Sequence, residues 1–187
     1  MQAIEALLKR RSAKALTDPA PDAGALQLLL ECASRAPDHG RLRPWRFIVI
    51  RGAARERLGG LLADQLQRKL PAASAETLQR ERQKALRAPL IVVVAAVRNA
   101  AARIPAIEQI LAAGGAAQNI MLAANALGFG AMWKTGDAAY DETVKTALGL
   151  AGEDAIVGFL YLGTPAADGV QPATRGEWQD RVSYWGE

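Results

Sequence analysis

Apolar residues recur at helical spacing over much of the chain. Positions three and four apart predict a first helix over residues 3–10. The spacing returns over residues 26–36, where Asp22 is placed to cap a helix and Pro37 to end it. Further helices are predicted over residues 53–70, 75–86, 106–127 and 140–148.

Continuous apolar runs predict strands between these helices. Residues 90–97 read LIVVVAAV, without polar alternation, which is typical of a central strand covered on both faces. The helix over residues 106–127 is nearly all small or apolar, with Gly114 and Gly115 in its middle, so we expect it to be a buried axis. Shorter strands are predicted over residues 45–51, 131–135 and 156–163, and the chain therefore mixes α and β elements.

Composition is that of an ordinary packed domain. The chain has 187 residues, 50% hydrophobic and 22% charged, and no long linker interrupts it, so we expect a single domain over residues 1–187. The first twelve residues lack the continuous apolar stretch of a signal peptide, and the longest apolar runs are too short or interrupted for a membrane span. We expect a cytoplasmic protein that does not enter a membrane.

The net charge and the number of possible metal-binding side chains limit the functions that this chain could have. One histidine and one cysteine cannot supply the usual nitrogen and sulfur ligands of a metal centre, so no metal site is expected. The net charge of +4 suits an anionic small ligand. No nucleic-acid partner is expected because no recognised binding motif is present. The Gly-x-Gly-x-x-Gly and P-loop nucleotide motifs are absent too.

The segment RRSAK at the end of the first helix is a candidate phosphate site. Arg10, Arg11, Ser12 and Lys14 bring two guanidiniums, a hydroxyl and an ammonium together within five residues. Arginine binds phosphate oxygens through two parallel hydrogen bonds, and serine can add another. The alternative is structural, because basic residues in a last helical turn also complement the helix dipole.

Two further segments are candidates for contacts to a planar ligand. In RAPDHGRLRPWRF, Arg35 and Pro37 accompany His39, which could donate to a bound heterocycle or could tie down its own loop. In GFGAMWKTG, glycines bracket a short apolar strand and allow a close backbone approach, although Trp133 could equally be a core residue.

These segments together resemble the nitroreductase family, in particular its shortest members. The resemblance rests on RRSAK, RAPDHGRLRPWRF, GFGAMWKTG and GFLYLGTP, in this order and spacing, and covers residues 5–165. It implies an α+β nitroreductase-like fold, with a mixed central sheet flanked by helices. It also implies an interlocked homodimer that holds FMN between its two chains.

The resemblance also implies roles for particular residues. One chain would hold the FMN phosphate and ribityl chain with Arg10, Arg11 and Ser12, and place Lys14 near the pyrimidine edge. The partner chain would add its loop, and the strand of GFGAMWKTG would line the flavin ring. The residues implied at the ring are Arg35, Pro37 and His39 from the loop, and Ala131, Met132, Trp133 and Thr135 from the strand and its end.

Two features depart from or extend this pattern. Many family members carry Pro-Ser-Ser and an asparagine in the loop, whereas this chain has Pro37-Asp38-His39-Gly40, so contacts to the ring are expected to differ. A basic residue near the C-terminus often assists the phosphate in the family, and Arg175 and Arg181 are the two candidates here.

The implied activity is that of an NAD(P)H-dependent oxidoreductase. NAD(P)H would reduce FMN by hydride transfer and leave, and a nitroaromatic, quinone or similar electron-poor acceptor would then take the electrons. The flavin carries the chemistry, so no catalytic side chain is required. The alternative is an FMN-binding carrier or sensor with little turnover, because a family fold does not guarantee activity.

Overall fold

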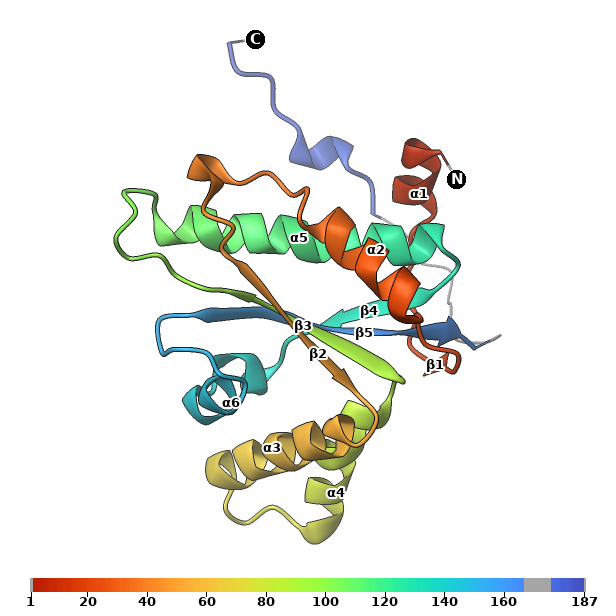
Figure 1. Ribbon diagram of the computed structural model, residues 1–187, viewed down its shortest axis with the longest axis vertical. Coiled ribbons are helices and arrows are strands. Elements are labelled where there is room, and N and C mark those ends of the chain that lie inside the picture. Colours follow the sequence, from red (N-terminus) through yellow and green to blue (C-terminus); the bar gives the residue numbers. More distant parts are fainter. Residues whose placement is uncertain (1, 167–175, 187) are drawn as a thin grey trace.

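The computed structural model describes residues 2–166 and 176–186, and its centre is an antiparallel sheet (Figure 1). Strand β3 (Leu90–Ala96) lies between β2 (Trp45–Arg51) and β5 (Ala155–Pro165). Strand β5 also pairs with β4 (Gly130–Lys134) and, at its end, with β1 (Leu16–Thr17). Every strand pairing within the described ranges is antiparallel.

Helices cover both faces of this sheet. Figure 1 shows α2 (Ala23–Ala33) and α5 (Ala106–Ala126) on one face. The other face carries α3, α4 and α6. These are α3 (Ala54–Lys69), α4 (Ala75–Gln83) with the 3-10 turn η2 (Lys84–Leu86), and α6 (Glu142–Ala147) after the 3-10 turn η3 (Asp137–Tyr140). The expected α+β fold with helices flanking a central sheet is confirmed.

Strand β3 joins two hydrophobic cores. Its side chains alternate between the faces. Ile91 and Val93 pack into the core beneath α3, whereas Val92 and Val94 pack into the core beneath α2 and α5. All seven residues of β3 are buried. This explains why the run has no polar alternation.

Local capping explains where several helices begin and end. The Asp22 carboxylate accepts a hydrogen bond from the Ala25 backbone N–H at 2.8 Å, as predicted for an N-cap. Helix α2 ends at Ala33, three residues before the predicted end, and a turn fills the gap to Pro37. Ser74 caps α4 in the same way, through the Thr77 N–H at 3.2 Å.

Helix α5 is buried on one face only, which corrects the expectation of a fully buried axis. Gly115 lies against the loop after α2, where an added Cβ would be 3.4 Å from the Cβ of Ala36. Ala113 and Ala116 lie on the buried face, whereas Ile107 and Leu111 lie on the other face and are 58% and 65% exposed. The composition of the helix predicts burial all round because a single sequence does not reveal which apolar face lacks a neighbour within the chain.

A second exposed apolar surface lies on the first helix. Helix α1 (Ala3–Lys9) contacts α5, and its residues Ile4 and Leu8 are 68% and 67% exposed. The C-terminal segment, which includes the 3-10 turn η4 (Gln179–Arg181), also exposes Trp178 and Trp185. No helix within the described residues is long and apolar enough to cross a membrane.

Candidate functional site

The N-terminal basic segment lies directly beside β4. The Ala13 backbone N–H donates to the Ala131 carbonyl at 3.0 Å. Gly130 makes the close approach possible, because an added Cβ would be 2.9 Å from the Cβ of Ala13 and 2.6 Å from Leu16 Cδ2. Two predicted site segments that are far apart in the sequence are therefore brought together.

The basic side chains of this segment differ in exposure and in local contacts. Arg11 Nη1 donates to the carbonyls of Leu8 and Arg10 at 3.0 and 3.2 Å, so this guanidinium binds the last turn of α1. Arg11 therefore interacts with the C-terminal end of α1, as the structural alternative for the basic segment predicts. The Nη1 of Arg10 is buried, whereas Ser12 and Lys14 are exposed.

A cavity of about 600 Å³ opens where β4 ends. Trp133, Thr135 and Gly136 line one wall, and the side chains of Phe159 and Tyr161 on β5 contribute beside them. Helix α3 supplies the opposite wall with Leu62, Gln65 and Leu66. This volume lies within the range of small-molecule sites, about 300–1,000 Å³.

Trp133 serves the core and the cavity at once. Its indole Nε1 donates to the Val157 carbonyl at 3.1 Å. Gly158 lies beneath the ring, where an added Cβ would be 2.1 Å from Nε1. Nearby, Ala131 is buried and Met132 is half-buried against the core beneath α3. The packing of Trp133 agrees with the core interpretation, and the contact of this strand with a planar ligand stays a prediction.

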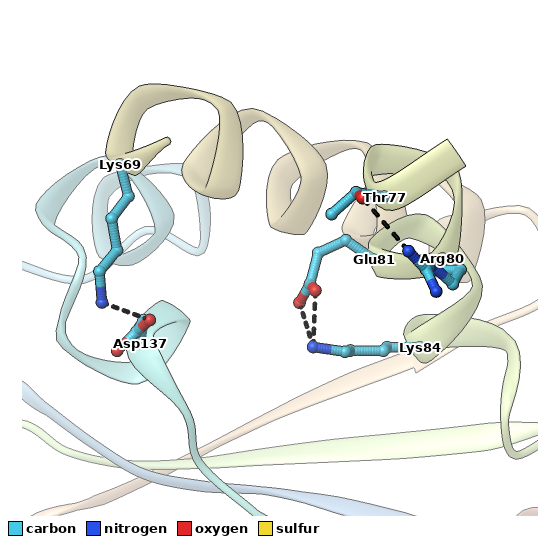
Figure 2. A network of polar contacts seen from close by, with 6 residues as sticks. All are labelled: Lys69, Thr77, Arg80, Glu81, Lys84 and Asp137. Atoms are coloured by element: carbon cyan, nitrogen blue, oxygen red, sulfur yellow. Dashed lines mark hydrogen bonds and ion pairs between the residues drawn. The ribbon is translucent and has the colours of Figure 1, made fainter. Parts of the chain in front are cut away.

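The charged end of the cavity comes from Glu81 and Lys84, which lie within the predicted helix over residues 75–86, and from Arg87 just after it. Lys84 Nζ lies 2.7 Å from Glu81 Oε1 and 2.6 Å from Oε2, as Figure 2 shows. The exposed side chain of Arg87 follows one turn later. The spacing of three between Glu81 and Lys84 could have indicated the ion pair, but not the cavity that it borders.

Two uncharged polar groups line the same cavity. Gln65 is 8% exposed and Tyr161 is 5% exposed. Within the described residues, neither side chain has a hydrogen-bond partner in the protein. Burial raises the pKa of Tyr161 to about 12, against a smaller opposing effect of the Arg87 charge. Tyr161 is therefore neutral at physiological pH and able to donate a hydrogen bond.

The predicted loop lies elsewhere, along the first half of α5. His39 begins the 3-10 turn η1 (His39–Arg41), and its Nδ1 lies 2.6 Å from Glu108 Oε2. Pro37 packs near Gly115, and Arg35 is exposed. His39 is thus anchored by a carboxylate rather than by the backbone groups that the structural alternative proposed.

One chain does not bring all predicted residues together. Glu108 is in the first turn of α5, and β4 begins just after the last turn. At 1.5 Å per residue, about 27 Å of helix separates Glu108 from Ala126. The loop of His39 and the segment of Arg10 are therefore at opposite ends of α5.

The structure describes one of the two C-terminal candidates. Arg175 lies outside the described residues. The exposed Arg181 pairs with its neighbour Asp180, with 3.1 Å between Nε and Oδ2. Among residues 2–166 and 176–186, no group of three or more histidine, cysteine, aspartate or glutamate side chains could hold a metal ion.

Comparisons with known proteins agree on one family. The model described as "Nitroreductase family" matches residues 7–164. A protein of Escherichia coli K12, provisionally named NAD(P)H nitroreductase YdjA, is 42% identical over 166 residues, which cover 88% of this chain and 89% of its own. A Haemophilus influenzae protein, also provisionally named an NAD(P)H nitroreductase, is 36% identical over 186 residues, with 98% and 100% covered.

Solved structures support the same fold. A nitroreductase-like protein of Bacillus cereus superposes with a TM-score of 0.85 at 24% identity, covering 100% of this chain and 97% of its own. A provisionally named nitroreductase of Desulfovibrio desulfuricans, crystallised with FMN, has a TM-score of 0.76 at 27% identity, with 97% and 95% covered.

Proposed function

This chain belongs to the nitroreductase family, and from that premise we propose that it is an FMN-dependent oxidoreductase. It would use NAD(P)H to reduce nitroaromatic, quinone or similar electron-poor acceptors in a ping-pong cycle in the cytoplasm. The observation that carries the proposal is the hydrogen bond from Ala13 to Ala131, which sets the basic segment beside the strand that leads into the cavity.

The residues present fit FMN by their chemistry. Arg10, Arg11 and Ser12 offer the donors that a phosphate dianion requires. The cavity of about 600 Å³ offers aromatic surface from Phe159 and Tyr161 together with polar groups, as a flavin ring requires. We propose that Arg10, Arg11 and Ser12 hold the phosphate and ribityl chain, that Lys14 lies near the pyrimidine edge, and that Ala131, Met132, Trp133 and Thr135 line the ring.

The side chains bind and tune, and they do not transfer protons. Bound FMN would supply the redox chemistry by accepting a hydride and passing the electrons on. The charge of Lys14 would stabilise the negative charge that reduction creates. The neutral Tyr161 and the amide of Gln65 would donate hydrogen bonds into the cavity, and Leu62 and Leu66 would exclude water from it.

We propose that two chains complete each site. The loop is separated from the N-terminal segment by the length of α5 within one chain, so Arg35, Pro37 and His39 would come from the partner. The exposed apolar residues on α1 and α5 support this arrangement, because such surfaces mark protein interfaces.

The decisive test is the visible absorption spectrum of the freshly purified protein, before and after anaerobic addition of NADPH or NADH. Flavin bands that bleach would support the reductase and identify its donor. Bands that persist with both donors would favour a carrier or sensor, and no bands after reconstitution with FMN would overturn the flavin assignment. Arg10→Ala should release FMN, whereas Arg57→Ala, an exposed change on α3, should retain it.

A further inference from the structure

Four arginines gather at one end of the sheet, on the two segments that follow α2 and β3. The Val97 N–H donates to the Pro44 carbonyl at 2.6 Å, which extends the β2–β3 ladder beyond the pair Trp45–Ala96. Arg43 precedes Pro44 and Arg98 follows Val97, so both arginines are next to this hydrogen bond. The two segments therefore run side by side past the ends of their strands.

A second contact joins the same segments further out. Gly40 has a φ of +74°, and an added Cβ would be 2.3 Å from Ile104 Cδ1. Arg41 follows Gly40, and Arg103 precedes Ile104, so both lie at this contact. We refer to Arg41, Arg43, Arg98 and Arg103 as the arginine patch.

The guanidiniums of the arginine patch have no direct ion-pair partner in the described part of the chain. All four side chains are exposed, and within the described residues none of their guanidiniums forms an ion pair or a hydrogen bond. Other basic side chains are paired, for example Arg68 with Asp141 and Lys69 with Asp137. Four guanidiniums without direct partners on neighbouring segments can donate hydrogen bonds to a bound anion.

Three carboxylates around the arginine patch have partners other than its guanidiniums. Asp38 Oδ2 accepts from the Arg43 backbone N–H at 2.6 Å. Glu108 Oε2 lies 2.6 Å from His39 Nδ1. Asp154 accepts from the backbone N–H groups of Arg98 and Ala151 at 2.9 and 2.8 Å. These acids hold the segments in place and leave the guanidiniums to a ligand.

The backbone of the loop is held in an unusual conformation. Arg41 and Arg43 have φ values of +54° and +49°, in the left-handed region that residues with a Cβ rarely adopt. Such residues persist only where the surroundings determine them, and they cluster at binding sites. The Asp38 hydrogen bond and the Gly40 contact supply those surroundings.

We propose that the arginine patch binds the 2′-phosphate of NADPH and makes NADPH the preferred electron donor. The inference rests on the proposed function, in which His39 lies at the partner's flavin, two residues from Arg41. In Rossmann dinucleotide sites a carboxylate binds the ribose 2′-hydroxyl of NADH, whereas an arginine accommodates the 2′-phosphate of NADPH, and the same chemistry of donors and acceptors applies to an unrelated site. Here the nearby carboxylates are occupied and the arginines are available.

Kinetics with both donors test the proposal. The double variants Arg41→Ala/Arg43→Ala and Arg98→Ala/Arg103→Ala should each raise KM for NADPH about tenfold. KM for NADH and both kcat values should stay within about twofold, because NADH lacks the 2′-phosphate. Arg41→Lys/Arg43→Lys should recover part of the loss, and Arg51→Ala, at the far end of β2, should change neither KM.

Equal increases in KM for NADPH and NADH would overturn the proposal, since the arginine patch would then contact only the pyrophosphate. Loss of FMN from the double variants would also overturn it, by assigning the patch to the flavin phosphate. Unchanged constants would overturn it as well.

A binding measurement separates this inference from the proposed function. By calorimetry, the unmodified protein should bind NADP⁺ about tenfold more tightly than NAD⁺, and the double variants should not distinguish them. This result with a protein that shows no flavin turnover would refute the reductase and retain the NADP⁺ site. If both donors bleach the flavin and the protein binds NADP⁺ and NAD⁺ with equal affinity, the reductase would be supported and the 2′-phosphate site would be refuted.

Discussion

Tyr161 should make the fold sensitive to alkaline pH. Burial raises its pKa to about 12, whereas an unfolded tyrosine titrates near 10. Between these values the unfolded chain has lost the proton and the folded chain keeps it, so stability falls as pH rises. The loss approaches about 2–3 kcal/mol near pH 12 and is absent at pH 8.

Urea unfolding at pH 8 and pH 11 measures this effect. Tyr161→Phe should reduce the drop in unfolding free energy between the two pH values. Tyr140→Phe, which alters a 75% exposed tyrosine, should leave the drop unchanged. An equal drop in the Tyr161→Phe protein would contradict the prediction.

The charge of Lys14 should favour reduced flavin. Lys14→Ala is expected to lower the two-electron reduction potential by on the order of 20–30 mV, because a positive charge near the pyrimidine edge stabilises the reduced anion. Lys14→Arg should keep the potential close to that of the unmodified protein. Dye equilibration in a spectroelectrochemical cell gives both values, and an unchanged potential in Lys14→Ala would count against this role.

The exposed face of α5 should determine whether the protein is a dimer. Leu111→Glu places a charge on a residue that is 65% exposed in the single chain, so the fold should persist while association is lost. Sedimentation velocity should show a monomer that releases FMN, and circular dichroism should show unchanged helix content. Leu70→Glu, at a 49% exposed leucine after α3, is the matched control and should remain dimeric.

Elements with a strong local signal could be predicted, and contacts between distant elements could not. The all-apolar run of β3 and the Asp22 cap of α2 lie where predicted because each depends on neighbouring residues. Strand β1, with two residues, is too short to produce a periodic pattern. It exists because it pairs with the end of β5, a contact between distant parts of the chain.

The same contrast between local signals and distant contacts holds for the candidate site. The basic segment was predicted from its residue types, but its position beside β4 is a contact between distant parts of the chain that the sequence did not reveal. Gln65 and Lys84 were missed because both lie in charged helical runs that are typical of solvated surfaces. Only the packing of α3 and η2 against β5 places them at a cavity.

A dimer assembled from two differently mutated chains should contain one intact FMN site. If each site takes Arg10 from one chain and His39 from the other, a mixed dimer of Arg10→Ala and His39→Ala chains has one intact site and one doubly defective site. Random association of equal amounts makes half of the dimers mixed, so about a quarter of all sites should bind FMN.

Co-expression with two different affinity tags, followed by flavin quantification, measures this recovery. A mixture of Arg10→Ala and Ser12→Ala chains is the control, because both changes affect the same side of the site and no intact site can form. Recovery in the control, or none in the test pair, would contradict the two-chain site.

Gly130 in β4 and Gly158 in β5 limit which parts of the site can change as the acceptor range of this protein evolves. Gly130 and Gly158 leave no room for an added methyl group, so a change at either position would displace Ala13, Leu16 or Trp133 and should be selected against. The α3 side chains Leu62 and Leu66 line the cavity, and they can be shortened without moving the backbone. Natural drift and directed evolution toward bulkier acceptors should therefore accumulate changes on α3, and the β4 wall should stay invariant among the descendants.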